Sequence, residues 1–160
     1  MNNSAIVSHW LPCPVVFIST AFEDKRDIMT ATAMFVSEKE PLVNVSVAKG
    51  HLTTKLIEQS GGFTLIIASE DQKELANQLG SVRGDAEDKF KRFSISTLPS
   101  EPGKPLIPSG SSVWFECAVV SSHETGEYIV FTARVINQQD LGNPPLLWQK
   151  GKLYGLKKLL

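Results

Sequence analysis

Strand-like runs dominate this sequence, and they constrain its fold more than any other feature. Short segments rich in valine, isoleucine, phenylalanine and threonine, bounded by glycine, proline or polar residues, are typical of β-strands. We expect strands at residues 15–20, 30–37, 42–48, 63–68, 113–121 and 128–137, with a weaker one at 152–157. Strand and helix patterns do not alternate regularly. The sequence therefore favours a mainly β fold, an antiparallel β-barrel with a few helices, over a parallel α/β sheet.

Helical patterns are few and short. One is expected at Thr53–Ser60 and another at Ser69–Leu79. They end at Gly61 and Gly80, and glycine is the residue that most readily adopts the left-handed conformation of a helix C-cap. A third short helix is expected at 85–93. Helices of this number and length suit the rim of a barrel.

Length and composition favour one water-soluble domain covering residues 1–160. The chain has 160 residues, of which 42% are hydrophobic, enough for one core and too few for two comfortable domains. Its formal net charge is −1 and its basic residues are scattered, which argues against a nucleic-acid surface. Apolar runs such as 15–18 and 63–68 are far shorter than a membrane span. With no signal pattern near residue 1, we expect no membrane contact and a cytoplasmic location.

The residue types that carry metal or acid–base chemistry are dispersed. His9, His51 and His123 lie far apart and show no metal-ligand spacing. Cys13 and Cys117 lie in apolar contexts, which predicts buried, reduced thiols. The sequence contains neither a dinucleotide-binding glycine motif nor a phosphate-binding Walker loop. We therefore expect no metal site, and no side chain is assigned as a catalytic acid or base.

One loop, between the strand at 42–48 and the following helix, collects polar side chains. Lys49 and His51 stand just before a helix that we expect to open at Thr53 or Thr54. Backbone N–H groups at a helix N-terminus have no intrahelical partner and carry the positive end of the helix dipole, so they favour anions. These are the ingredients of a phosphate site. An ordinary threonine N-cap beside a solvated lysine fits the same residues, and the loop taken alone favours that alternative.

Several motifs, taken in order along the chain, resemble the flavin reductase-like family of FMN-binding split barrels. This family includes flavoredoxins and the reductase components of two-component monooxygenases. The matching segments are the Pro-x-Pro-Val opening of a strand that ends at Ser19-Thr20, Met29-Thr30-Ala31-Thr32, the Pro-Leu-Val strand with its threonine-containing loop, the Ser-Gly-x-Phe entry to the next strand, Asp88-Lys89-Phe90, and the late segments "WFECAVV" and "LLWQKGKLYGL". The resemblance covers nearly the full length of the chain.

The resemblance implies a six-stranded Greek-key split barrel that works as a homodimer, with an FMN site at or near the subunit interface. It implies an NAD(P)H-dependent flavin reductase, in which hydride passes from NADH or NADPH to flavin N5 and reduced flavin serves a partner monooxygenase or another acceptor. Such chemistry relies on the cofactor, so a catalytic triad is not required. Two alternatives remain open: a non-enzymatic FMN electron carrier of flavoredoxin type, and a split-barrel protein with an empty site.

The resemblance also implies which residues bind FMN. They are Thr30, Ala31 and Thr32 beside the flavin ring, Val47 and Ala48 beside the ribityl chain, Lys49, His51, Thr53 and Thr54 around the phosphate, and Lys89 and Phe90 at the rim. Each group has an ordinary structural alternative as well. The threonines could face outward on a barrel strand, and a phenylalanine on an amphipathic helix is commonly a core residue.

In two places the chain departs from the family pattern. Residues 25–27, just before the Met-Thr segment, read Lys-Arg-Asp where the family often has an Asp-Gly turn, so extra charge is expected in a loop beside the flavin edge. Many relatives also have a Gly-Asp-His segment whose histidine lies near the nicotinamide. Here residues 126–128 read Gly-Glu-Tyr. An aromatic ring with a hydroxyl can stack and also hydrogen-bond, so Tyr128 is the expected nicotinamide-binding residue. A structural tyrosine in the barrel wall, or a protein without efficient NAD(P)H use, fits the same residue.

Overall fold

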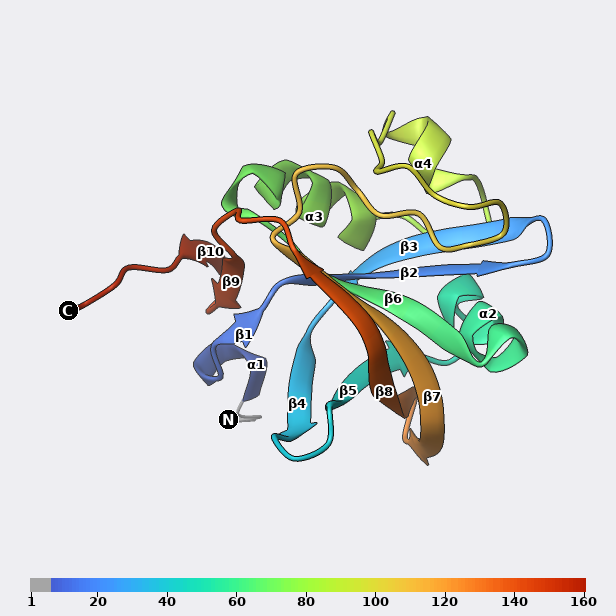
Figure 1. Ribbon diagram of the computed structural model, residues 1–160, viewed down its shortest axis with the longest axis horizontal. Coiled ribbons are helices and arrows are strands. Elements are labelled where there is room, and N and C mark those ends of the chain that lie inside the picture. The colour runs from blue at the N-terminus through green and yellow to red at the C-terminus, as the bar shows by residue number, and fades with distance from the viewer. Residues whose placement is uncertain (1–6) are drawn as a thin grey trace, which may run out of the picture.

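Antiparallel strands form the core of the computed structural model, which describes residues 7–160 (Figure 1). Seven of them make one sheet in the order β3-β2-β6-β7-β8-β5-β4, and every pair of neighbours is antiparallel. The strands are β2 (Val16–Phe22), β3 (Lys25–Ala31), β4 (Ala33–Ser37), β5 (Leu42–Ala48), β6 (Gly62–Ile67), β7 (Val113–Thr125) and β8 (Tyr128–Asp140). The mainly β, antiparallel class expected from the sequence is confirmed.

The order of the strands is that of a Greek key. β6, β7 and β8 lie side by side, and β5, which precedes them in the chain, lies on the far side of β8. This arrangement of four antiparallel strands matches the Greek-key pattern. The expected topology is therefore confirmed.

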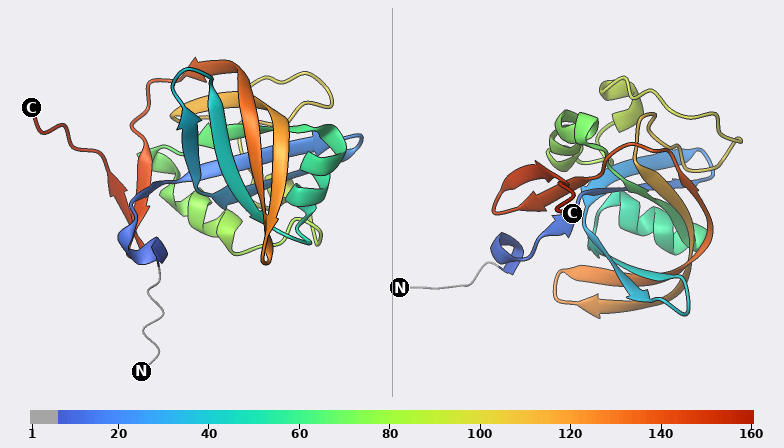
Figure 2. Two further views of the ribbon diagram at one scale, coloured as in Figure 1. Left: turned by 90° about the horizontal axis from the view of Figure 1, so that it is seen from below. Right: turned by 60° about the vertical axis from the view of Figure 1, so that its left-hand side comes forward.

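A corner at Thr32 explains how the sheet curves into a barrel. β3 and β4 stand at opposite edges of the sheet, yet Thr32 alone separates them in the chain. Two edges joined through one residue must bend toward each other, and the strands accordingly wrap around a common interior (Figure 2). The single strand predicted at 30–37 was wrong, and seven strands replace the expected six. A pattern of alternating residues does not reveal where a strand turns a corner.

The sheet is buried on both faces along β2. Val16 and Ile18 point into a cluster inside the barrel, whereas Val15 and Phe17 belong to a second cluster on the outer face. All four side chains are at most 3% exposed. A strand covered on both faces reads as a continuous apolar run instead of an alternating one, which accounts for the run at 15–18.

Helix α2 (Leu52–Ser60) begins one residue before the predicted start and lies against β2 and β3. Its N-cap is His51, so the prediction that Thr53 or Thr54 opens the helix was wrong. The C-cap at Gly61 has φ 72°, as expected for a left-handed cap.

The second predicted helix is divided. It consists of a 3-10 turn, η1 (Glu70–Gln72), followed by helix α3 (Lys73–Gly80), which packs against the outer face of β3. Gly80 is the last residue of α3 and not a left-handed cap; Ser81 is the C-cap, in a right-handed conformation. The third helix, α4 (Lys89–Arg92), covers only part of the predicted span. Asp88 is its N-cap and accepts hydrogen bonds from the backbone N–H groups of Phe90 and Lys91.

A small second sheet flanks the barrel. It has the order β1-β9-β10 and contains β1 (Cys13–Pro14), β9 (Leu146–Gln149) and β10 (Lys152–Gly155), next to the short helix α1 (Val7–Trp10) (Figure 2). β10 lies within the weak strand expected at 152–157. The residue pattern did not predict β9, because four residues after a proline pair carry too little pattern. The segment "LLWQKGKLYGL", which resembles the late strands of the family, does contain it.

The two cysteines are free, as expected, but differ in burial. Cys117 is buried in the barrel cluster, and this burial raises the pKa of its thiol to about 12. Cys13 is only partly buried, so the expectation of two buried thiols was half right. Residues 1–6 lie outside the described part of the chain, and the expectation of one domain over residues 1–160 stays a prediction.

Candidate functional site

A cavity of about 820 Å³ opens beside the corner of the barrel. Four parts of the chain form most of its wall: the end of β3 with Thr32, the end of β5 with the turn into α2, the end of α3 with the loop that follows it, and the first residue of β8. The other lining residues are Ser8 of α1, Trp148 and Leu153 of the small sheet, Val15, Asp27 and Lys89. Its volume falls within the range of about 300–1,000 Å³ that is usual for small-molecule sites.

Seven of the twelve predicted site residues line this cavity. They are Thr30, Ala31, Thr32, Ala48, His51, Lys89 and Tyr128. These residues come from four separate segments, and folding brings them to one place. Val47 and Phe90 are instead core residues, 0% and 5% exposed. Because strand side chains alternate between faces, Val47 points into the barrel when its neighbour Ala48 borders the cavity.

Of the four residues expected around the phosphate, His51 lines the cavity and Lys49, Thr53 and Thr54 do not. Lys49 donates a hydrogen bond to Glu124 of β7, with Nζ 2.7 Å from Oε2. Thr53 and Thr54 are buried, and their hydroxyl groups point inward: that of Thr53 donates to Asp27 at 2.5 Å and that of Thr54 to the Ala48 carbonyl at 2.8 Å. Their role in phosphate binding stays a prediction.

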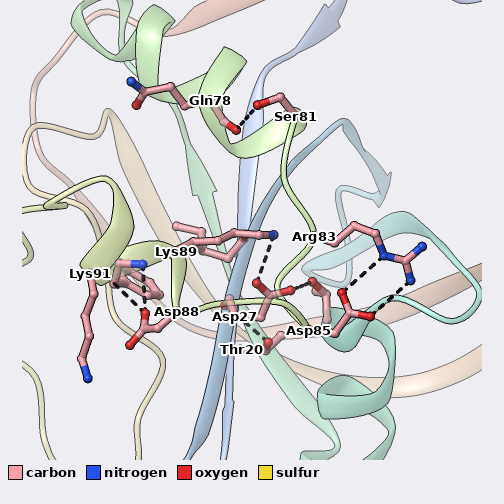
Figure 3. A network of polar contacts seen from close by, with 12 residues as sticks. Thr20, Asp27, Gln78, Ser81, Arg83, Asp85, Asp88, Lys89 and Lys91 are labelled. Carbon is pink, nitrogen blue, oxygen red and sulfur yellow. Dashed lines mark hydrogen bonds and ion pairs between the residues drawn. The ribbon is translucent and has the colours of Figure 1, made fainter.

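Beneath the cavity, Asp27 and Lys89 form a buried ion pair (Figure 3). Lys89 Nζ lies 3.1 Å from Asp27 Oδ1, and both side chains are 3% exposed. The lysine also donates to the Ile28 carbonyl at 2.8 Å, while Thr53 occupies the other oxygen of Asp27. Asp27 therefore ties α4 and the first turn of α2 to β3. The expectation of an open charged loop at 25–27 was wrong, because these residues begin a strand and Asp27 is buried.

Arg26 makes a second link between β3 and α4. Its Nε and Nη2 donate to Asp88 Oδ2 at 3.2 and 2.7 Å. Partial burial acts to raise the pKa of Asp88, but the hydrogen bonds and charge of Arg26 outweigh it and hold that pKa below its ordinary value. Each residue of the Asp88-Lys89-Phe90 motif thus has a separate anchoring role: helix cap, buried cation and core side chain.

The sequence reasoning missed the segment that follows α3. Leu79 and every residue from Gly80 to Asp85 line the cavity. Arg83 Nε and Nη2 lie 3.3 and 3.5 Å from the two carboxylate oxygens of Asp85 (Figure 3). Nη2 also donates to the Gly50 carbonyl at 3.4 Å. The only local signal was an arginine beside a glycine just after a helix end. Such a signal is too common to identify a site.

Gly84 holds this segment against the buried ion pair. A Cβ atom built at Gly84 would overlap the carboxylate of Asp27, so only glycine fits at this close approach of backbone to side chain. The loop that carries Arg83 and Asp85 is thereby seated on Asp27. Its position depends on a residue more than fifty positions earlier in the chain.

Tyr128 stands at the cavity mouth as the first residue of β8. It is 50% exposed and lies opposite Ala48 in the register of β5 and β8. The preceding turn contains Gly126, whose φ is 56°, and the Glu127 carbonyl accepts a hydrogen bond from the Lys49 backbone N–H at 2.8 Å. The turn between β7 and β8 is therefore joined to the turn between β5 and α2.

Within residues 7–160, no group of three or more His, Cys, Asp or Glu side chains could hold a metal ion. In the same span, no helix has both the length and the apolar character needed to cross a bilayer.

Comparison with known proteins places these features in context. A family model described as "Flavin reductase like domain" matches residues 7–157. Among curated proteins, the chain is similar to HsaB, the reductase subunit of a flavin-dependent monooxygenase from Mycobacterium tuberculosis: the two are 30% identical over 150 residues, which cover 91% of this chain and 77% of HsaB.

Solved structures resemble the fold over nearly the whole chain. The NADH:FAD oxidoreductase SgcE6 of Streptomyces globisporus C-1027 has a TM-score of 0.86 at 18% identity, covering 99% of this chain and 96% of that protein. Flavoredoxin from Methanosarcina acetivorans has a TM-score of 0.81 at 20% identity, covering 100% and 91%. These likenesses confirm the expected split-barrel fold.

Proposed function

The chain belongs to the flavin reductase-like family, and on this premise we propose that it is an NAD(P)H-dependent FMN reductase. The observation that carries the proposal is the cavity of about 820 Å³, whose wall contains the end of β3 with Thr32, Ala48 and Tyr128. The curated relative HsaB is named a reductase subunit, and SgcE6 is named an NADH:FAD oxidoreductase. We place the activity in the cytoplasm, where its nicotinamide donor is available.

The cavity residues fit FMN in size and chemistry. Residues 30–32 and Ala48 have small side chains, which leave room for a flat ring close to the backbone. Tyr128 supplies an exposed aromatic ring for the nicotinamide. Bound FMN would supply the hydride-accepting nitrogen. The protein would bind and orient both partners and exclude water, which requires no acid or base side chain.

The remaining predicted residues support the site from behind. Val47 fills the core beneath Ala48, and Phe90 and Lys89 hold α4 against β3. Thr53 fixes the first turn of α2 through Asp27. We propose Lys49 only as an outer contact, since it would have to leave Glu124 to reach a ligand.

Anaerobic mixing tests the function. Purified protein is loaded with FMN and mixed with NADH or NADPH while the flavin absorbance is followed. With at least one of the two nucleotides, we expect the absorbance of oxidised flavin to disappear at a rate that saturates as the nucleotide concentration rises. Bound flavin that neither nucleotide reduces would instead support an electron carrier, the activity suggested by the flavoredoxin neighbour. Failure to bind flavin would leave a split-barrel protein of another function.

Tyr128→Ala is expected to raise the KM for the nicotinamide donor by about two- to tenfold, because one aromatic contact is worth about 0.5–1.5 kcal/mol. FMN affinity should remain within about twofold of wild type. Tyr154→Ala is the matched control: Tyr154 is similarly exposed, at 45%, but does not line the cavity. Stopped-flow reduction measures the first quantity and flavin fluorescence the second. Equal KM values for both variants would remove Tyr128 from donor binding.

We propose that the protein acts as a homodimer that uses β4 in its interface. The strand pairs only with β5, so its other edge is free within the described chain. It also exposes three consecutive apolar side chains: Met34 is 64%, Phe35 67% and Val36 45% exposed. A free apolar edge strand is a surface that proteins normally cover. A second copy of the chain is the partner that the family resemblance implies.

Light scattering tests the dimer. Wild type is expected to have twice the monomer mass at micromolar concentration, and Phe35→Asp is expected to shift the equilibrium toward monomer by at least about tenfold, because burying an unpaired carboxylate is costly. A monomeric wild type with FMN present would overturn the proposal. Unchanged association of Phe35→Asp would place the interface elsewhere.

A partner monooxygenase, as the relative HsaB has, is the proposed acceptor of reduced flavin.

A further inference from the structure

We propose that Arg83 is the residue that recognises the terminal phosphate of the flavin, and that Asp85 is the counter-ion which the phosphate displaces. The inference rests on the proposed function and refines it. It moves the main phosphate contact from Lys49, the residue suggested by the sequence, to a loop that sequence reasoning did not single out.

The charges around the cavity point to Arg83. Among lysines and arginines of residues 7–160, only Lys89 and Arg83 line it. Lys89 is 3% exposed and its amino group is already engaged by Asp27 and the Ile28 carbonyl. The side chain of Arg83 is 62% exposed. Arg83 is therefore the cavity-lining cation that a ligand can reach without breaking a buried ion pair.

The partner that Arg83 has in this structure is weakly held. Its two contacts with Asp85 measure 3.3 and 3.5 Å, and Asp85 is 48% exposed. Exposed ion pairs are screened by solvent and contribute little to stability, so exchange of the carboxylate for a phosphate costs little. A guanidinium presents two parallel N–H groups, and a phosphate offers oxygens that accept both. The hydrogen bond from Arg83 also lowers the pKa of Asp85, which keeps the competing carboxylate ionised.

The position of Arg83 is set by its neighbours. Gly84 seats the loop on the buried carboxylate of Asp27, and Arg83 itself donates to the Gly50 carbonyl across the gap between two cavity-lining turns. The guanidinium therefore lies next to the N-terminus of the nine-residue helix α2, whose N-cap His51 makes no side-chain capping bond. A phosphate held by Arg83 would also lie near the unpaired backbone N–H groups of α2.

Lys49 offers none of these features. Its amino group is 2.7 Å from Glu124, near the end of β7, and it does not line the cavity. FMN and riboflavin differ only in the phosphate, so the preference for FMN measures phosphate recognition. If Arg83 binds the phosphate, its replacement lowers this preference and replacement of Lys49 does not; if Lys49 binds it, the reverse is expected.

Fluorescence titration of FMN and riboflavin tests the assignment. Arg83→Ala is expected to weaken FMN binding by about tenfold, the loss of one charge-assisted contact in a partly solvated site, and to leave riboflavin affinity within about twofold. Asp85→Asn, which removes the competitor, is expected to strengthen FMN binding by about two- to fivefold. Arg92→Ala is the matched control, since Arg92 also pairs with an exposed carboxylate, that of Glu87, but does not line the cavity.

Each other outcome overturns the inference. Equal weakening of FMN and riboflavin by Arg83→Ala would mean that Arg83 supports the loop and does not read the phosphate. Loss of discrimination in Lys49→Ala but not in Arg83→Ala would return the phosphate to Lys49. Wild type that binds both flavins equally would refute phosphate recognition while hydride transfer could still be observed. Arg83→Lys provides a variant that keeps the charge, and intermediate discrimination is expected of it.

Discussion

Lys89→Met is expected to lower the free energy of unfolding by about 3–5 kcal/mol, because it leaves the carboxylate of Asp27 buried without its cation. Both side chains of the pair are 3% exposed, and no solvent reaches the carboxylate to replace the ammonium group. The loss of the bond to the Ile28 carbonyl adds to the effect. Urea unfolding followed by circular dichroism measures the change.

Two further variants isolate the cause of this loss. Asp27→Asn combined with Lys89→Met removes both charges, so it should recover most of the stability that Lys89→Met alone loses. Lys104→Met is the surface control: Lys104 pairs with Glu116 at 3.3 Å but is 55% exposed, and a change below about 1 kcal/mol is expected. If Lys89→Met and Lys104→Met unfolded at the same urea concentration, the Asp27–Lys89 pair would have no special role in stability.

Gly84→Ala is expected to destabilise the protein by about 1–3 kcal/mol, the usual cost of forcing an extra carbon into a packed site. The new methyl group would overlap the carboxylate of Asp27, which Lys89 and Thr53 hold in place. The loop that contains Gly84 would then have to move away from Asp27. Because this loop carries Arg83 and lines the cavity, FMN affinity should fall together with stability, by about tenfold or more.

Gly80→Ala is the matched control for stability. Gly80 lies in the same segment, but a Cβ atom there meets nothing within 4 Å, and its backbone is helical. Alanine is favoured over glycine in a helix by about 1 kcal/mol, so this variant is expected to be as stable as wild type or more so. Thermal unfolding compares the two. Equal melting temperatures for Gly84→Ala and wild type would show that the loop does not depend on its contact with Asp27.

The sequence alone determined the class of the fold and the location of most elements. The strand predicted at 42–48 coincides with β5, and Gly61 ends α2 in the expected left-handed conformation. Both features depend on near neighbours along the chain: alternation within a strand, and the backbone freedom of glycine. The ordered motifs also led to the family that the comparisons show. Local sequence patterns were sufficient to predict those features whose physical cause lies in residues near one another in the chain.

Only the tertiary structure decided which charges face the cavity. Lys49 and Arg83 are both basic residues beside glycines, and the local sequence favoured Lys49 because a helix follows it. Packing gives Lys49 a partner 75 positions away, at Glu124, and leaves Arg83 on the cavity wall. The sequence predicted Asp27 to be a charged loop residue, but in the fold it is buried and contacts Lys89 of α4 and Thr53 of α2. The partner and exposure of a charged side chain depend on segments distant in the chain, so they are known only once those segments have packed.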